Sequence, residues 1–191
     1  MSQEEILALA VTRSDHGQRV FELEPAIDMA LNNNLAGPIL QIGNGEGGSA
    51  LLILDKLSKL KLNDRLLELY TVDTNPAPSI IGIWADKLGI FYQHFTCSQE
   101  EFVKDEATYV RFLRWSLVYL DADHRYESVV RDMKLLVKNI AKNGILIVDD
   151  VDGWETIPEL VDVGLERVDY KVDEGPKLGP HGHHVAVWRK L

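Results

Sequence analysis

The order of apolar and polar positions predicts strands alternating with helices along most of the chain. Short apolar runs at residues 39–42, 69–72, 90–95, 117–120 and 145–148 have the length of strands. The clearest helix covers residues 126–141, where apolar side chains recur at spacings of three and four. Strands that are apolar throughout are typical of a parallel sheet covered by helices on both faces. The pattern therefore predicts a doubly wound α/β fold.

The N-terminal segment has a different pattern. Residues 3–11 and 18–31 have helical periodicity, with Pro25 predicted to interrupt the second helix and three asparagines after Leu31 to end it. We expect an N-terminal helical cap segment over residues 1–35, followed by a core over residues 36–191.

The C-terminal segment alternates between apolar and polar residues. Val168, Tyr170 and Val172 alternate with polar residues, residues 175–180 are rich in Gly and Pro, and alternation returns at Val185. This predicts an antiparallel hairpin at one edge of a mostly parallel, seven-stranded sheet. Because we find no linker or internal repeat, we expect residues 1–191 to form a single domain.

Composition limits the kinds of molecule that the protein is expected to bind and the cellular compartment in which we expect it. The formal net charge of -10 opposes binding to nucleic acid or an anionic membrane, because such binding needs Lys and Arg to neutralise phosphates. Cys97 is the only cysteine, and Glu4 and Glu5 lie where a secretory signal would be basic and then apolar. Apolar runs fall well short of the ~20 residues that span a bilayer. We expect a cytoplasmic protein.

A glycine-rich turn follows the first predicted strand. Gly43, Asn44, Gly45 and Gly48 lead into a predicted helix at residues 49–60, so the turn can approach a ligand closely and the helix offers free N–H groups. The same glycines would also suit a tight strand-to-helix turn with no ligand. The turn alone therefore does not identify a function.

Two further segments bear on a nucleotide-like cofactor. Asp73 follows the second strand at about the distance from the turn expected of a ribose-binding acid, although it also suits a turn or helix cap before Pro76. After the third strand, Ser98 is spaced to cap the next helix with Glu101, which is compatible with an adenine contact beside it. Turn and acid together fit either NAD or S-adenosylmethionine.

Acidic residues follow the fourth and fifth predicted strands. Asp121 and Asp123 come after one, and Asp149 and Asp150 after the other, so they should meet at one crevice. Gathered carboxylates repel unless a cation lies among them, and Mg²⁺ prefers oxygen ligands. The alternative is that some are solvated loop residues or helix caps. His124 is placed to serve as a general base at this crevice, or to be structural or solvated.

Taken together, these segments resemble the metal-dependent O-methyltransferases among the class I S-adenosylmethionine-dependent methyltransferases, which include catechol-type and macrolide-sugar enzymes. The most specific part is the run from Val118 to Glu127, followed by Asn143 to Asp150. The resemblance implies that Asp121, Asp149 and Asp150 hold Mg²⁺ and that His124 is the base. It also implies a cofactor site. The residues expected to bind the cofactor are Gly43, Asn44, Gly45, Gly48, Asp73, Ser98, Gln99 and Asp121.

The chain departs from that family at three positions. Gln41 stands where members usually carry Glu or Asp, which would weaken cofactor anchoring. Catechol-type enzymes have Lys where His124 stands and Asn where Asp150 stands, so these two residues point toward sugar-like hydroxyl substrates. Our leading hypothesis is a Mg²⁺-assisted O-methyltransferase acting on a small molecule.

Two alternatives stay open at this point. One is an NAD(P)-dependent oxidoreductase, since the glycine pattern matches that fingerprint, although Asp149 and Asp150 would have no role in it. The other is a non-catalytic cofactor-binding protein on a methyltransferase scaffold. The sequence does not identify the methyl acceptor, and it is compatible with either a monomer or a homo-oligomer.

Overall fold

The computed structural model describes residues 5, 8, 19–32, 37–60, 67–110, 113–121, 123–149, 164–168 and 185–191. These residues form a seven-stranded sheet in the order β3-β2-β1-β4-β5-β7-β6. The strands are β1 Ile39–Ile42, β2 Glu68–Asp73, β3 Phe91–Thr96, β4 Trp115–Leu120, β5 Ile140–Val148, β6 Leu165–Arg167 and β7 Ala186–Lys190. The helices are α2 Arg19–Asn32, α3 Gly48–Lys59, α4 Ser79–Leu88, α5 Gln99–Val110 and α6 Tyr126–Leu136.

The pairing of the strands confirms the predicted α/β fold. Strands β1 to β5 pair in parallel, with β1 lying between β2 and β4. Strand β7 pairs antiparallel with both β5 and β6, which confirms a C-terminal antiparallel hairpin. The first hairpin strand ends at Arg167, before the predicted alternation from Val168; Tyr170 and Val172 lie outside the described residues.

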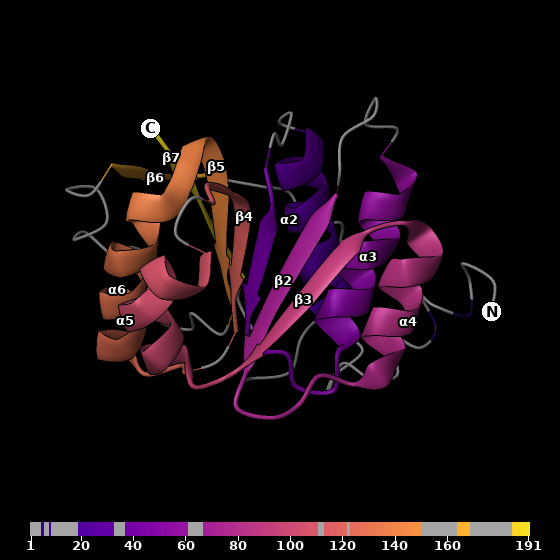
Figure 1. Cartoon of the computed structure of the whole chain (residues 1–191). Coiled ribbons are helices and arrows are strands. Elements are labelled where there is room, and N and C mark those ends of the chain that lie inside the picture. The colour runs from indigo at the N-terminus through magenta and orange to yellow at the C-terminus, as the bar shows by residue number, and fades with distance from the viewer. Residues whose placement is uncertain are drawn as a thin grey trace, which may run out of the picture.

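Helices cover both faces of the sheet (Figure 1). Helices α2, α3 and α4 pack on one face, and their apolar side chains form one core with residues such as Leu117 and Ile145. Helices α5 and α6 pack on the other face, in a second core that includes Phe102 and Met133. The central strands β1 and β4 are buried at every position, as the sequence pattern predicted, whereas the edge strand β3 is partly exposed.

The prediction that Pro25 interrupts the second N-terminal helix was wrong. Helix α2 runs from Arg19 to Asn32 with Pro25 inside it. Proline costs a helix one backbone hydrogen bond and introduces a clash. Here a stripe of buried side chains packs on the sheet face and outweighs that cost; it comprises Leu23, Ala26, Ile27, Ala30 and Leu31.

The predicted helix at residues 126–141 ends earlier than its periodicity indicated. Helix α6 ends at Leu136, the 3-10 turn η1 covers Val137–Asn139, and Ile140 begins β5. Ile140 fits the apolar stripe of a helix, but it pairs with Trp115 in the sheet. Asn143 adopts a left-handed backbone conformation with φ of 62°, which an α-helix does not allow.

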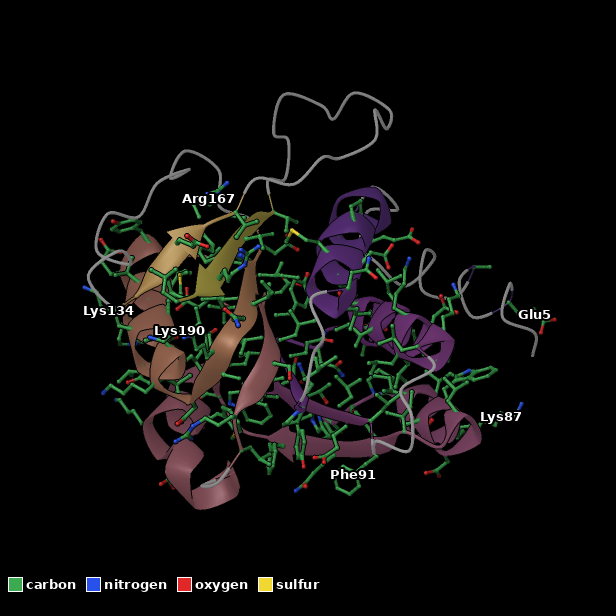
Figure 2. The ribbon with its side chains drawn as sticks, turned by 90° about the horizontal axis from the view of Figure 1, so that it is seen from above. Glu5, Lys87, Phe91, Lys134, Arg167 and Lys190 are labelled. Atoms are coloured by element: carbon green, nitrogen blue, oxygen red, sulfur yellow. The ribbon has the colours of Figure 1, made fainter. Side chains whose placement is uncertain are left out.

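The two edges of the sheet lie at opposite sides of the molecule, with Phe91 on β3 and Arg167 on β6 (Figure 2). The strand order reverses between β1 and β4, with β2 and β3 on one side and β5 on the other. Ligands of such sheets bind at the carboxyl ends of the strands beside that reversal. None of the described helices combines the length and apolar character needed to cross a membrane.

Candidate functional site

The glycine-rich turn after β1 takes a backbone shape that only glycine adopts easily. Gly43, Gly45 and Gly47 have φ of 84°, 44° and 87°, in the left-handed region. A Cβ on Gly47 would lie 2.8 Å from the Ile81 side chain, so this glycine also lets α4 pack against the turn. Gly48 is the first residue of α3.

Asp73, at the end of β2, is bonded directly to this turn. Its Oδ2 accepts hydrogen bonds from the backbone N–H of Asn44 at 2.7 Å and of Gly45 at 3.0 Å. Its Oδ1 accepts from the backbone N–H of Asn75 at 2.8 Å. The predicted ribose acid therefore also holds the turn in shape.

These bonds set the charge state of Asp73. Partial burial acts to raise the pKa of its carboxyl, but the backbone N–H groups of Asn75, Asn44 and Gly45 outweigh burial and lower the pKa below its usual value. Asp73 is therefore ionised at neutral pH and offers a fixed negative charge to hydroxyl donors.

Two buried side chains at the end of β1 carry polar atoms that need a partner. Gln41 is 0% exposed and donates from Nε2 to the Gly43 carbonyl at 2.9 Å, but its Oε1 has no partner in the described part of the chain. Asn44 is 5% exposed, and neither Oδ1 nor Nδ2 has a partner among the described residues. A buried polar atom without a partner costs about 1–3 kcal/mol, which a polar ligand or water beside the turn would offset.

A cavity of about 450 Å³ lies against the turn. Its lining draws on the carboxyl ends of β1, β2, β3 and β4, as expected at a sheet reversal. The lining residues are Ile42, Gly43, Gly45, Val72, Asp73, Thr74, Ser98, Gln99, Glu100, Asp121, Asp123, Arg125 and Arg131. Most of the predicted cofactor residues therefore share one cavity; of these predicted residues, Asn44 and Gly48 are not part of its lining.

Ser98 and Glu101 form the capping box predicted at the start of α5. Ser98 Oγ accepts from the Glu101 N–H at 3.1 Å, and Glu101 Oε2 accepts from the Ser98 N–H at 2.8 Å. Because Ser98 also lines the cavity, capping and a contact with a ligand are compatible, as expected.

Gln99 joins α5 to the loop after β4. Its Oε1 accepts from the backbone N–H of Asp123 at 3.0 Å, and its Nε2 donates to the buried carboxylate of Asp132 on α6. Arg131 binds the same carboxylate through Nε at 2.6 Å. Gln99, which lines the cavity, therefore helps to fix the position of the loop that carries His124.

The crevice is less acidic than the sequence suggested, because arginines also line it. Arg125 Nε and Nη2 bond to the Asp123 carboxylate at 3.0 Å and 2.6 Å. This guanidinium holds the pKa of Asp123 well below its usual range. Asp123, which the sequence placed at the acidic crevice, therefore forms an ion pair with Arg125. Asp132 forms one with Arg131 in the same way, and neither carboxylate is among the three predicted metal ligands.

Asp121 and Asp149 converge on one hydroxyl group. Asp121 directly follows β4, Asp149 directly follows β5, and the two strands are neighbours. The hydroxyl of Tyr119 lies 3.0 Å from Asp121 Oδ2 and 2.9 Å from Asp149 Oδ2. These two predicted metal ligands therefore lie side by side, with Asp149 2% exposed.

The charge state of Tyr119 follows from this environment. Burial first, and then the charges of Asp121 and Asp149, raise the pKa of the phenol well above its usual value. The phenol stays protonated, but it carries one proton and donates to only one carboxylate at a time. A cation beside the pair would relieve the repulsion between the two carboxylates.

The donor set fits a hard divalent cation in part. Mg²⁺ is usually bound by one or two carboxylates with waters and substrate oxygens completing its shell. Asp121 and Asp149 meet that requirement, while Asp150, the third predicted ligand, lies outside the described residues. Within the described ranges, no three His, Cys, Asp or Glu side chains are grouped to hold a metal.

His124 faces Asp121 from the loop that follows β4. Its Nε2 lies 3.9 Å from Asp121 Oδ1, and its side chain is 42% exposed. This distance is too long for a hydrogen bond but close enough for attraction between a carboxylate and an imidazolium. The predicted base and the predicted metal ligand are therefore neighbours.

Sequence reasoning missed Tyr119 and the acid partners of the arginines. Tyr119 lies inside an apolar run and was taken as part of a strand. Its position two residues before Asp121 was an available signal, because side chains two apart on a strand share a face. The contact between Gln99 and Asp132 had no such signal, since it joins two separate helices.

Residues 40–151, more than half of the chain, match a family described as a methyltransferase domain. The matched region contains the glycine turn, Asp73 and every residue predicted to act in catalysis or metal binding. No curated protein sequence is significantly similar to this chain.

Several solved structures share the fold. MycE, a methyltransferase from the mycinamycin biosynthetic pathway solved with Mg and S-adenosylhomocysteine, is 17% identical with a TM-score of 0.62 over 100% of this chain and 55% of that chain. An O-methyltransferase from Bacillus cereus, in complex with S-adenosylhomocysteine, is 12% identical with a TM-score of 0.60 over 99% and 90%. An rRNA methylase from Streptococcus thermophilus is 13% identical with a TM-score of 0.61 over 89% and 96%.

At these identities the similarity concerns the fold. The chain spans 55% of the MycE chain in that structure and 37% in a complex that also holds mycinamycin VI.

Proposed function

Because the chain belongs to the S-adenosylmethionine-dependent methyltransferase family, we propose that it methylates a hydroxyl oxygen of a small molecule with the assistance of Mg²⁺. The family membership removes the oxidoreductase alternative. The nature of the acceptor and the role of the metal form the proposal, and the arrangement of Asp121, Asp149 and His124 supports both.

The cofactor would bind in the cavity beside the glycine turn. When bound, S-adenosylmethionine supplies a methyl group on a positively charged sulfur. Asp73 is ionised and lies at the cavity wall, where it can accept hydrogen bonds from ribose hydroxyls. Ser98 and Gln99 lie at the wall that follows β3, in the position proposed to meet the adenine. The Gln41 oxygen, which has no partner among the described residues, gives the turn an acceptor in place of the usual carboxylate.

Asp121 and Asp149 would hold the metal, together with Asp150. When bound, Mg²⁺ supplies Lewis acidity, which lowers the pKa of a coordinated hydroxyl. Asp121 lines the cofactor cavity and lies 3.9 Å from His124, so an acceptor hydroxyl beside this carboxylate would lie next to both. Such positioning of two reactants can supply about 7–11 kcal/mol of the barrier reduction.

His124 would accept the hydroxyl proton of the substrate. The acceptor oxygen then forms a bond to the methyl carbon as the bond from carbon to sulfur breaks, leaving S-adenosylhomocysteine. The Asp121 carboxylate lies 3.9 Å from His124 and stabilises the imidazolium that this transfer creates. General base catalysis of this kind typically contributes about 10²–10⁴ in rate.

The observation that carries the proposal is the convergence of Asp121 and Asp149 on one hydroxyl. Two neighbouring carboxylates suit a divalent cation, and such a cation can lower the pKa of a hydroxyl acceptor. The similarity to an rRNA methylase extends to the fold alone. RNA as acceptor is also opposed by the net charge of -10, and Arg125 and Arg131 at the cavity are already paired with Asp123 and Asp132.

The test measures methyl transfer from radiolabelled S-adenosylmethionine to a panel of phenols, catechols and sugar hydroxyls, with Mg²⁺ or with a chelator. We expect transfer that requires Mg²⁺ and is abolished by Asp121→Ala, while S-adenosylhomocysteine still binds this variant. An active Asp121→Ala protein that is insensitive to chelation contradicts the role of the metal. Transfer to an amine or RNA substrate alone contradicts the proposed acceptor.

A further inference from the structure

Tyr119 holds an unusual position for a phenol in a sheet. Its side chain is fully buried on the face covered by α2, α3 and α4, among Leu117, Ile145 and Ile147. A phenylalanine would satisfy that apolar environment equally well. The hydroxyl therefore needs an explanation other than packing.

The backbone of the site is fixed without Tyr119. The Asp121 N–H donates to the Ile42 carbonyl at 2.8 Å, and the Asp149 N–H donates to the Leu120 carbonyl at 3.0 Å. These bonds extend the sheet by one residue on each strand. They place the two Cα atoms, but backbone bonds do not by themselves orient the carboxylate groups.

The hydroxyl of Tyr119 contributes to the orientation of these carboxylate groups, because it can donate its one proton to either carboxylate in turn. It lies at hydrogen-bond distance from Oδ2 of Asp121 and from Oδ2 of Asp149. The other oxygen of Asp121, Oδ1, lies toward His124. In Asp121, Oδ2 thus lies at the phenol of Tyr119, while Oδ1 is turned toward the proposed base, His124.

A second contact ties the hydroxyl to the cofactor side of the site. The Ser49 side chain lies close enough to the Tyr119 hydroxyl to act on the pKa of the phenol, in the lowering direction. Ser49 is the second residue of α3, the helix that begins at the glycine turn. Tyr119 therefore joins the carboxylate pair to the element that carries the proposed cofactor site.

We propose that Tyr119 is a positioning residue, whose hydroxyl holds the carboxylates of Asp121 and Asp149 in the orientation that binds a divalent cation. This inference rests on the metal site of the proposed function. Groups that orient metal ligands in this way are worth about 10–100-fold in metal affinity.

The experiment titrates Mn²⁺ into the full chain saturated with S-adenosylhomocysteine and follows free Mn²⁺ by electron paramagnetic resonance. Tyr119→Phe should bind Mn²⁺ at least about tenfold more weakly than the wild type, with the same affinity for S-adenosylhomocysteine. Tyr92→Phe is the matched control. Tyr92 lies on the edge strand β3, away from the carboxylate pair, and its hydroxyl is hydrogen-bonded to Thr71 at 2.9 Å. It should leave Mn²⁺ affinity unchanged.

A double substitution separates positioning from a general structural effect. If Tyr119 acts through the carboxylates, Tyr119→Phe should weaken Mn²⁺ binding by a smaller factor once Asp149→Asn is present, because only the contact with the Asp121 carboxylate then remains. Full additivity of the two changes contradicts the proposal. So does equal Mn²⁺ affinity of Tyr119→Phe and the wild type.

A second variant covers the case in which Tyr119→Phe does not fold, as judged by circular dichroism. Ser49→Ala then takes its place and should weaken Mn²⁺ binding severalfold. An unchanged affinity of Ser49→Ala contradicts the proposal. If the wild type binds no Mn²⁺ at millimolar concentration, the metal site of the proposed function fails and the role of Tyr119 fails with it. Binding by the wild type with no effect of Tyr119→Phe overturns the role of Tyr119 alone.

Discussion

The Tyr119 hydroxyl lies 2.9 Å from Asp149 Oδ2, and Asp149 is almost completely buried. An ionised carboxylate in such a place is costly unless hydrogen bonds or a cation offset the loss of water. The same hydroxyl also lies at hydrogen-bond distance, 3.0 Å, from Asp121 Oδ2. Two neighbouring carboxylates in one site are therefore expected to favour metal binding at some cost to the stability of the metal-free protein.

Asp149→Asn should separate those two effects. The amide keeps the shape of the side chain and removes one of the two charges, so the metal-free protein should become about 1 kcal/mol more stable, as is common when the strain of a functional site is relieved. Chemical denaturation in the presence of a chelator measures this change. Mg²⁺ should then stabilise the variant less than it stabilises the wild type. A clear loss of stability in the metal-free variant would show that the charge of Asp149 is already compensated.

Asp73→Asn should weaken cofactor binding. An asparagine has one oxygen where Asp73 uses two, so it can keep the bonds to the N–H of Asn44 and Gly45 only by giving up the bond to the N–H of Asn75. We expect at least about a tenfold loss of affinity for S-adenosylhomocysteine, since a hydrogen bond to a charged group is worth about 1.5–3 kcal/mol.

Calorimetric titration measures the loss for Asp73→Asn, and Asn75→Ala provides the control. That substitution removes only the 3.3 Å side-chain contact with Asp73 and leaves the backbone N–H in place. Its affinity should stay within about twofold of the wild type, because this long contact is a weak hydrogen bond. Equal losses in the two variants would argue that the turn, and not the charge of Asp73, governs binding.

The lowered pKa of Asp73 also predicts how stability depends on pH. A carboxyl whose pKa is lower in the folded state contributes stability that is fully present above its unfolded value of about 3.9. That contribution is lost as the pH falls through the folded pKa, which lies below this value. Urea denaturation between roughly pH 5 and pH 2 should show a smaller loss of stability on acidification in Asp73→Asn than in the wild type. Parallel pH profiles would contradict the contribution of Asp73.

His124→Ala should lower turnover far more than binding. If His124 accepts the substrate proton, kcat should fall by about 10²–10⁴ while the affinity for S-adenosylhomocysteine stays unchanged. Steady-state kinetics on a hydroxyl substrate found in the panel, together with calorimetry, measure both quantities. A fall in activity of less than about threefold would exclude a role as the main base.

The fold could be predicted from the sequence because burial on both faces leaves a direct signature in the strands. Each of the five apolar runs became a strand of the parallel part of the sheet. The errors arose where packing overrides local preference. Pro25 is held inside α2 by the core, and Ile140 pairs with Trp115 in the sheet although its spacing suits a helix.

The candidate site could be predicted only as far as it depends on strand ends. Residues directly after parallel strands meet at one edge, so the closeness of Asp121 and Asp149 followed from topology. The capping box of Ser98 and Glu101 followed from a local spacing rule. The roles of Tyr119, Arg131 and Asp132 depend on side-chain directions and on the packing of separate helices, which no local pattern specifies.

We propose above that Asp121 and Asp149 bind a divalent cation beside the cofactor cavity. The most direct measurement is a crystal structure of the protein grown with Mn²⁺ and S-adenosylhomocysteine, with an anomalous difference map at the manganese absorption edge. We expect a peak within about 2.3 Å of carboxylate oxygens from Asp121 and Asp149, close to the distances of oxygen-bound divalent ions. A cofactor-bound structure with no anomalous peak at these carboxylates would contradict it.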